Sequence, residues 1–137
     1  MFWNIDPITL VLINWLRGNR AHKCNFNALS FIAGVDEVGR GCLAGPVIAA
    51  AVVLKTNIPG LADSKKLSKK KREELSSTIM QNSYFSFGSS PVEEIDSINI
   101  LQASLLAMKR AILNLSVEPG KILVDGTHKL DLDIDTQ

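Results

Sequence analysis

Two apolar runs separated by a glycine-rich turn constrain the fold of this chain more than any other feature. The first run starts at Phe31 and ends in a pair of acids, Asp36 and Glu37, and the second is Val47–Leu54. Runs of this length, rich in Val, Ile and Ala and bounded by Gly and Pro, are typical of buried strands joined by a tight turn. The sequence therefore predicts two core strands here.

The next elements are a helix and a strand. Ser68 is a candidate N-cap for a helix that runs to about Asn82, with Leu75 and Ile79 on its inner face. Tyr84–Gly88 alternates aromatic and small residues, which predicts a strand.

Two more helices are expected after this strand. A capping box with a proline at the first helical position, Ser90–Glu93, opens a short helix. Asn99, with Gln102 three residues later, opens a longer helix that we expect Pro119 and Gly120 to end. Large apolar residues at three- and four-residue steps form its predicted inward stripe: Leu101, Leu105, Met108, Ile112 and Leu115.

A short apolar run, Ile122–Val124, predicts the last strand and is followed at once by Asp125. The order of elements predicts an α/β fold, a mixed sheet with helices packed against it. With 137 residues, 46% of them hydrophobic and 21% charged, the chain has the length and composition of one globular domain. We assign residues 1–29 to an N-terminal extension and residues 30–137 to this domain.

The N-terminal extension contains one helical pattern. Asp6 is a candidate N-cap with Pro7 at the first helical position, and an apolar face follows: Ile8, Val11, Leu12, Trp15 and Leu16. This stretch falls short of the roughly 20 apolar residues that span a bilayer, and no basic segment precedes it as in a signal peptide. Because the two cysteines lack a C-x-x-C spacing, we expect free thiols and a cytoplasmic location.

Basic residues gather in one place although the formal net charge is only +1. Residues 65–72 hold six of the 15 Lys and Arg residues: Lys65, Lys66, Lys69, Lys70, Lys71 and Arg72. Three lysines in a first helical turn oppose the helix dipole, which prefers negative charge there. The cluster indicates either contact with a nucleic-acid backbone or a solvated helix face.

Three acids each close an apolar strand: Asp36, Glu37 and Asp125. If the first and last strands are neighbours, these carboxylates converge and repel one another unless a divalent cation neutralises them. Oxygen ligands without His or Cys favour Mg²⁺ or Mn²⁺, and such a cluster suits metal-assisted phosphoryl transfer. The alternatives are that Glu37 is exposed or pairs with Arg40, and that Asp125 only begins a turn.

One geometric condition applies to this acidic site. Successive side chains of a regular strand point to opposite faces, so Asp36 and Glu37 share a metal only if the strand ends or bulges there. Gly39 and Gly41 predict such a distortion. The spacing Gly39-x-Gly41-x-x-Ala44 also matches a dinucleotide-binding turn, but a strand pattern follows it in place of the helix that would hold the pyrophosphate.

Four motifs, in this order and spacing, resemble those of the ribonuclease HII family: GVDEVGRGCLAGPV, LADSKKLSKKKREEL, EEIDSINILQASLLAMKRAI and ILVDG. The resemblance covers about residues 31–126 and implies a ribonuclease H-like mixed sheet flanked by helices. It also implies an endonuclease, dependent on Mg²⁺ or Mn²⁺, that cuts the RNA strand of RNA/DNA hybrids and the 5′ side of ribonucleotides embedded in duplex DNA.

The resemblance implies roles for individual residues. Asp36, Glu37 and Asp125 would be the metal-binding catalytic carboxylates. A turn would read the ribonucleotide's 2′-hydroxyl and the adjoining phosphate, and a loop would contact phosphate: Gly39, Arg40 and Gly41 in the turn, and Ser64, Lys65 and Lys66 in the loop. A backbone at glycines approaches a ligand closely enough to sense the 2′-hydroxyl, the group that separates RNA from DNA.

The family also has parts that would lie beyond Gln137, namely a fourth catalytic aspartate, a tyrosine near the ribonucleotide and C-terminal helices. Asp131, Asp133 and Asp135 do not stand in a matching context. Residues 30–137 would then be a partial ribonuclease H-like catalytic domain, incomplete at its C-terminus and monomeric. We expect either a nuclease fragment or a truncated, catalytically weak product that binds nucleic acid, with weak or no cleavage by this polypeptide alone.

Overall fold

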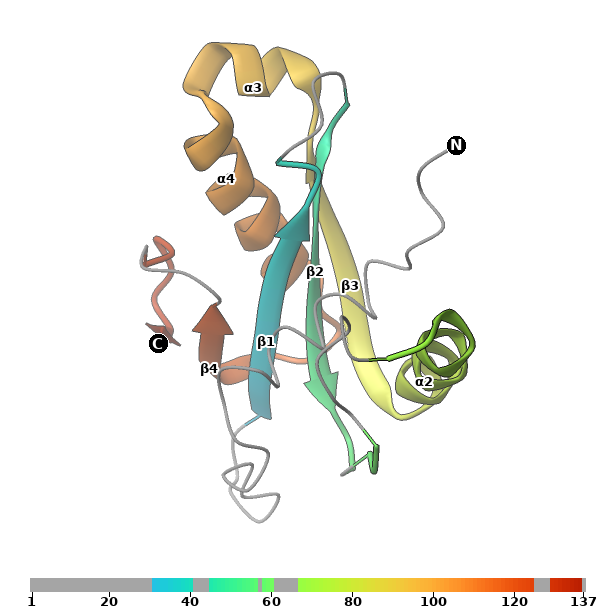
Figure 1. Ribbon diagram of the computed structural model, residues 1–137. Coiled ribbons are helices and arrows are strands. Elements are labelled where there is room, and N and C mark those ends of the chain that lie inside the picture. The colour runs from blue at the N-terminus through green and yellow to red at the C-terminus, as the bar shows by residue number, and fades with distance from the viewer. Residues whose placement is uncertain (1–30, 41–44, 57, 61–66, 125–128, 137) are drawn as a thin grey trace.

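The structure is a computed structural model that describes residues 31–40, 45–56, 58–60, 67–124 and 129–136 (Figure 1). Its strands are β1 (Phe31–Val38), β2 (Val47–Leu54), β3 (Ser83–Ser90), β4 (Pro119–Val124) and β5 (Asp135–Thr136). Its helices are α2 (Lys69–Gln81), α3 (Val92–Ile98) and α4 (Ile100–Leu113). Within these ranges, no helix is long and apolar enough to cross a membrane. The helix predicted after Asp6 lies outside the described residues.

One mixed sheet joins the five strands in the order β3-β2-β1-β4-β5. Neighbours are antiparallel from β3 to β1, whereas β1 with β4 and β4 with β5 are parallel. The predicted mixed sheet is therefore confirmed. The strand before Asp36 and the strand before Asp125 are neighbours, which is the condition on which the acidic site depends. Because they are parallel, their carboxyl ends lie at the same edge of the sheet.

Different helices cover the two faces of the sheet (Figure 1). One face packs with α4 in an α4-side cluster that includes Val35, Ala49, Ala107 and Met108. The opposite face packs with α2 in an α2-side cluster that includes Ala50, Val52, Leu75 and Ile79. Because side chains alternate along a strand, each strand residue can be assigned to one of these faces.

The prediction for α2 is confirmed. Ser68 is the N-cap, and its hydroxyl accepts a hydrogen bond from the backbone N–H of Lys71 at 3.2 Å. Asn82 is the C-cap, and Leu75 and Ile79 are buried as expected. The lysines of the first turn remain exposed, and so do the acids Glu73 and Glu74 of the next turn.

The inward stripe predicted for α4 is only partly right. Met108 and Ile112 are buried, but the other deeply buried apolar positions are small: Ala103, Ala107 and Ala111. Leu101 and Leu105 are only half-buried. Small residues face the sheet because Gly88 of β3 lies directly under the helix and lets the two backbones approach closely.

Two predicted boundaries around these helices are wrong. α4 ends at Leu113 with Asn114 as its C-cap, so Pro119 and Gly120 belong to β4 and do not end the helix. The capping box at Ser90 does not form, because Pro91 is the N-cap of α3 and makes no side-chain cap. The start of α4 is confirmed, since the side chain of Asn99 accepts from the backbone N–H of Gln102 at 3.0 Å.

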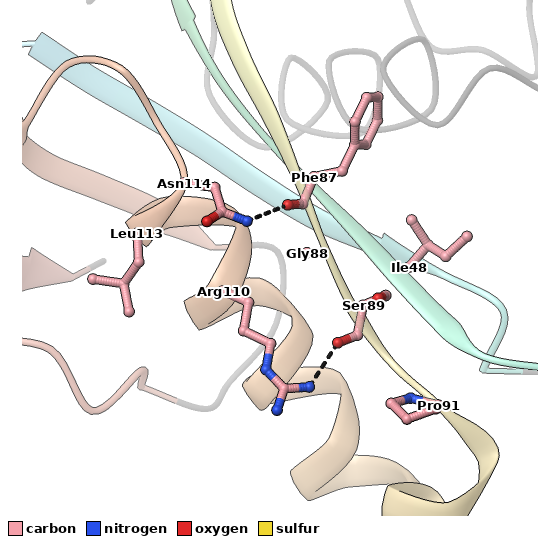
Figure 2. Close-up of a pocket in the computed structure, with 8 residues that line it drawn as sticks. All are labelled: Ile48, Phe87, Gly88, Ser89, Pro91, Arg110, Leu113 and Asn114. Carbon is pink, nitrogen blue, oxygen red and sulfur yellow. Dashed lines mark hydrogen bonds between the residues drawn. The ribbon is translucent and has the colours of Figure 1, made fainter.

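Instead of a capping box, Glu94 and Arg110 clasp α3 to α4 and to the end of β3. The guanidinium of Arg110 donates to both carboxylate oxygens of Glu94 at 2.6 and 2.7 Å, and the hydroxyl of Ser90 donates to the same carboxylate at 2.7 Å. Arg110 also donates to the carbonyl oxygen of Ser89 at 2.8 Å (Figure 2). The clasp holds three consecutive elements together.

Gly88 should be hard to replace. A β-carbon at this position would overlap the carbonyl oxygen of Ala107 and the amide nitrogen of Ala111, so α4 would have to move off the sheet. We expect Gly88→Ala to lower the free energy of unfolding by about 1–3 kcal/mol in urea titrations, as overpacked cores do. Ser89→Ala, at the exposed neighbour, should change it by less than about 0.5 kcal/mol. Equal effects of the two substitutions would contradict the close packing.

The Glu94–Arg110 pair should make stability depend on pH in acid. Hydrogen bonding to Arg110, and then to Ser90, lowers the pKa of Glu94 from 4.5 to about 2. Because the folded-state pKa is the lower one, the stabilisation is present above about pH 4.5 and is lost as the pH falls toward 2. The difference in thermal midpoint between wild type and Glu94→Gln should therefore shrink across this window. The control Glu93→Gln, at an exposed acid of the same helix, should show no such trend, and a constant difference for Glu94→Gln would refute the assignment.

Candidate active site

The candidate site lies beside the last described pair between β1 and β4. The parallel register joins Gly34 to Leu123 and Val35 to Val124, and no later pair follows in the described residues. The next residue on β1 is Asp36. The residue that follows Val124 in the sequence is Asp125, which lies outside the described residues.

Asp36 is a buried acid. Only 6% of the residue is exposed, and its partner on β2 is Ala50. Its Oδ1 atom accepts a hydrogen bond from the backbone N–H of Glu37 at 2.8 Å. Burying a carboxylate is costly unless hydrogen bonds or a positive charge compensate, and this hydrogen bond supplies part of that compensation.

The two carboxylate oxygens of Glu37 have different surroundings. Its side chain is 9% exposed, and its Oε1 atom accepts from Arg40 at 3.2 Å. Its Oε2 atom is buried and has no hydrogen-bond partner within the described part of the chain. The ion pair with Arg40 was the alternative role for Glu37, and it does form. The pair uses one oxygen, and the chemistry of the second, buried oxygen fits a cation ligand.

The predicted distortion of the first strand is wrong. β1 continues through Val38, and its pairs with β2 run in regular register across Asp36–Ala50 and Glu37–Ala49. Ala50 belongs to the α2-side cluster and Ala49 to the α4-side cluster. The carboxylates of Asp36 and Glu37 therefore leave β1 on opposite faces of the sheet.

Gly39 makes the turn after β1 possible. Its φ is +98°, and a β-carbon there would lie 2.7 Å from the carbonyl oxygen of Pro46. No other residue type fits both this conformation and this space. Arg40 follows and is half exposed, whereas Gly41 lies outside the described residues.

The basic cluster is described only in part. Ser64, Lys65 and Lys66 lie outside the described residues. In α2, the ammonium of Lys69 lies 4.0 Å from Glu73, and that of Lys71 lies 3.8 Å from Glu74. These exposed pairs are weak, so both roles proposed for the cluster stay open.

The described residues contain no group of three Asp, Glu, His or Cys side chains that could hold a metal ion. Asp36 and Glu37 supply two carboxylates, and the third predicted ligand is outside that part. The donors that are present, all oxygen and at least partly buried, fit Mg²⁺ or Mn²⁺.

We did not predict from the sequence that Phe87 lies on the same face of the sheet as Asp36. Asp36, Ala50 and Phe87 are consecutive partners across β1, β2 and β3, so Phe87 shares the face of Asp36 about 10 Å away at two strand spacings. The alternation of Tyr84–Gly88 placed Phe85 and Phe87 on one face, but nothing in it showed that this face is left exposed.

Two solved structures share this arrangement of strands and helices. The ribonuclease H2 of Pyrococcus horikoshii matches with a TM-score of 0.63 at 27% identity, over 77% of this chain and 60% of that one. A ribonuclease HII from Archaeoglobus fulgidus, solved in complex with PCNA, matches with a TM-score of 0.64 at 26% identity, over 78% and 62%. The fold is thus ribonuclease H-like.

Sequence comparison narrows this class to one family. The ribonuclease HII family model matches residues 33–135, so the chain belongs to the ribonuclease HII family. Ribonuclease HII of Coxiella burnetii is 59% identical over 109 residues, and that of Pelagibacter ubique is 55% identical over 106 residues. These matches cover 77% and 76% of this chain, but 54% and 57% of the relatives. The chain therefore spans little more than half the length of these curated relatives.

Gly39→Ala should damage the site and the fold together. The substitution places a β-carbon against Pro46 in a left-handed backbone conformation, so we expect a loss of about 1–3 kcal/mol in the free energy of unfolding. Gly60→Ala is the matched control, because Gly60 also has a positive φ, +83°, but no atom within 4 Å of the added carbon. A smaller loss for Gly60→Ala would isolate the contact with Pro46, and equal losses would contradict its importance.

Proposed function

We propose that this chain carries the catalytic core of a divalent-metal-dependent endoribonuclease. Its substrates would be RNA/DNA hybrids, cut in the RNA strand, and duplex DNA with embedded ribonucleotides, cut on their 5′ side. Membership of the ribonuclease HII family supports this activity. The observation that carries it is the buried Oε2 atom of Glu37, the residue next in sequence to the buried Asp36. In the ranges that the structure describes, this oxygen has no hydrogen-bond partner.

The last described pair between β1 and β4 is Val35–Val124, and Asp36 and Asp125 are the residues that follow in the sequence. We infer that carboxylates from both faces of β1 serve one site beside this pair. Asp125, covalently attached to Val124, is our proposed third ligand. Bound Mg²⁺ or Mn²⁺ would activate water and stabilise the charge that develops on phosphate.

The remaining proposed contacts orient the nucleic acid. Arg40 is 48% exposed while it holds Glu37, so its outer nitrogens can meet a phosphate without leaving the carboxylate. The turn at Gly39 allows the backbone to approach the sugar, where the 2′-hydroxyl is read together with Gly41. Ser64, Lys65 and Lys66 are proposed phosphate contacts, and the exposed lysines of α2 extend the same positive surface.

A second candidate function is nucleic-acid binding without cleavage. It is favoured by the register of β1, which directs Asp36 and Glu37 to opposite faces of the sheet and so separates two of the three proposed ligands. Two carboxylates bind a divalent ion more weakly than three, and weak metal binding slows hydrolysis. The exposed basic surface would be retained in either case.

Metal binding and cleavage should both depend on the acid pair. We expect Glu37→Gln and Asp36→Asn to weaken Mn²⁺ binding, followed by calorimetry, at least about 10-fold. Incision of a duplex with one ribonucleotide should fall in parallel. Asp96→Asn, at an exposed acid of α3, should leave both unchanged.

The outcomes separate the two functions. Metal-dependent incision that is lost in Glu37→Gln supports the nuclease. Duplex binding by the wild type, without incision at saturating Mn²⁺, supports the binding protein. Mn²⁺ affinity that is the same in wild type and both variants would refute the proposed site.

A further inference from the structure

The ion pair between Arg40 and Glu37 joins a buried group to an exposed one. The Nη1 atom of Arg40 donates a hydrogen bond to the Oε1 atom of Glu37 at 3.2 Å. The Glu37 side chain is 9% exposed, whereas that of Arg40 is 48% exposed. Gly39 lies between the two residues with a φ of +98°, and the turn that it makes brings Arg40 back to the strand. The guanidinium is thus held against the carboxylate while much of it faces solvent.

The second oxygen of Glu37 lies on the same carboxylate as the one that Arg40 contacts. This oxygen, Oε2, is buried and has no hydrogen-bond partner in the described ranges. A cation bound to it would be closer to the guanidinium than the Debye length, which is about 8 Å at physiological ionic strength. Because both groups are positive, each one weakens the attraction of the carboxylate for the other.

The exposed part of Arg40 is suited to a second partner. A guanidinium carries five N–H donors in a fixed plane, and phosphate oxygens are among the anions that this geometry recognises best. A phosphate bound to the exposed part of Arg40 would neutralise the guanidinium charge. The repulsion between Arg40 and a cation at Glu37 would then be relieved while the hydrogen bond to Oε1 remains.

We propose that Arg40 couples metal binding at Glu37 to contact with the nucleic-acid backbone. In the free protein, the charge of Arg40 lowers the affinity of Glu37 for a divalent cation. In the complex, the phosphate at Arg40 restores this affinity, and by linkage the cation strengthens the contact with phosphate by the same factor. Arg40 is thus a positioning residue that acts on the metal through Glu37. This inference rests on the proposed metal site.

The sign of one substitution tests the effect of Arg40 in the free protein. Arg40→Gln removes the charge, but its amide can still donate to Oε1. We therefore expect Mn²⁺ to bind about 3- to 10-fold more tightly, as measured by calorimetry with Mn²⁺ alone. Arg40→Lys keeps the charge and should bind Mn²⁺ like the wild type. Circular dichroism checks the fold of each variant.

A matched control separates this effect from a change in net charge. Lys109→Gln also removes one cation, from an ion pair of 3.9 Å with the exposed Asp131, and should leave Mn²⁺ affinity unchanged. A purely structural role of Arg40 predicts the opposite sign for Arg40→Gln, because a carboxylate that is less well held binds a metal more weakly.

The response to nucleic acid tests the coupling itself. The probe is a DNA duplex without ribonucleotides, which the proposed nuclease does not cut. Its affinity is measured by fluorescence anisotropy at low salt, with and without Mn²⁺. Mn²⁺ should strengthen duplex binding at least about 3-fold more in the wild type and Lys109→Gln than in Arg40→Gln. Mn²⁺ bound by the DNA itself affects all three proteins alike.

Failure of the coupling differs from failure of the metal site. If Glu37→Gln weakens Mn²⁺ binding but Arg40→Gln leaves it unchanged or weaker, the metal site stands and the coupling is wrong. An equal effect of Mn²⁺ on duplex binding in the wild type and Arg40→Gln would also overturn the coupling. If neither Glu37→Gln nor Arg40→Gln changes Mn²⁺ affinity, Glu37 is not a ligand and both proposals fail.

Discussion

The parallel pairing of β1 with β4 is the constraint on which the candidate site depends. It is fixed by apolar side chains on both faces: Val35 and Ile122 pack in the α4-side cluster, and Leu123 packs against the α2-side cluster. A slip of one residue would exchange these faces, which makes the register costly to change. Val35 meets Val124 in this register, and the residue that follows each of them in the sequence is an acid.

Close backbone approach is the second recurring constraint, and it appears at two glycines near the carboxyl end of β1. At Gly39, the absence of a β-carbon lets the turn pass against Pro46 and brings Arg40 back to Glu37. At Gly88, it lets α4 rest on the sheet through Ala107 and Ala111. The first approach shapes the site, and the second fixes the helix that covers the face from which Glu37 projects.

Local signals in the sequence predicted two of the three helix starts, while the capping box expected at Ser90 does not form. Ser68 and Asn99 marked true helix starts because a cap needs only its own neighbours. The buried face of α4 was misjudged because the choice of alanine over leucine depends on Gly88, 19 residues before Ala107. The prediction of a distorted strand at Asp36 and Glu37 was wrong because regular pairing with β2 continues along β1 through Val38. The adjacency of β1 and β4 could be stated only as a condition, since strand order is a property of the whole fold.

Arg110 of α4 and Asn114, the C-cap of this helix, also hydrogen-bond to backbone carbonyls of β3. β3 is the edge strand of the sheet, and its Phe87 and Ser89 carbonyls accept hydrogen bonds from Asn114 at 2.9 Å and Arg110 at 2.8 Å (Figure 2). Free acceptors along an edge strand are what template the addition of a foreign strand. With two of them already engaged, intermolecular β-pairing is discouraged at the strand where exposed aromatic residues would otherwise promote aggregation.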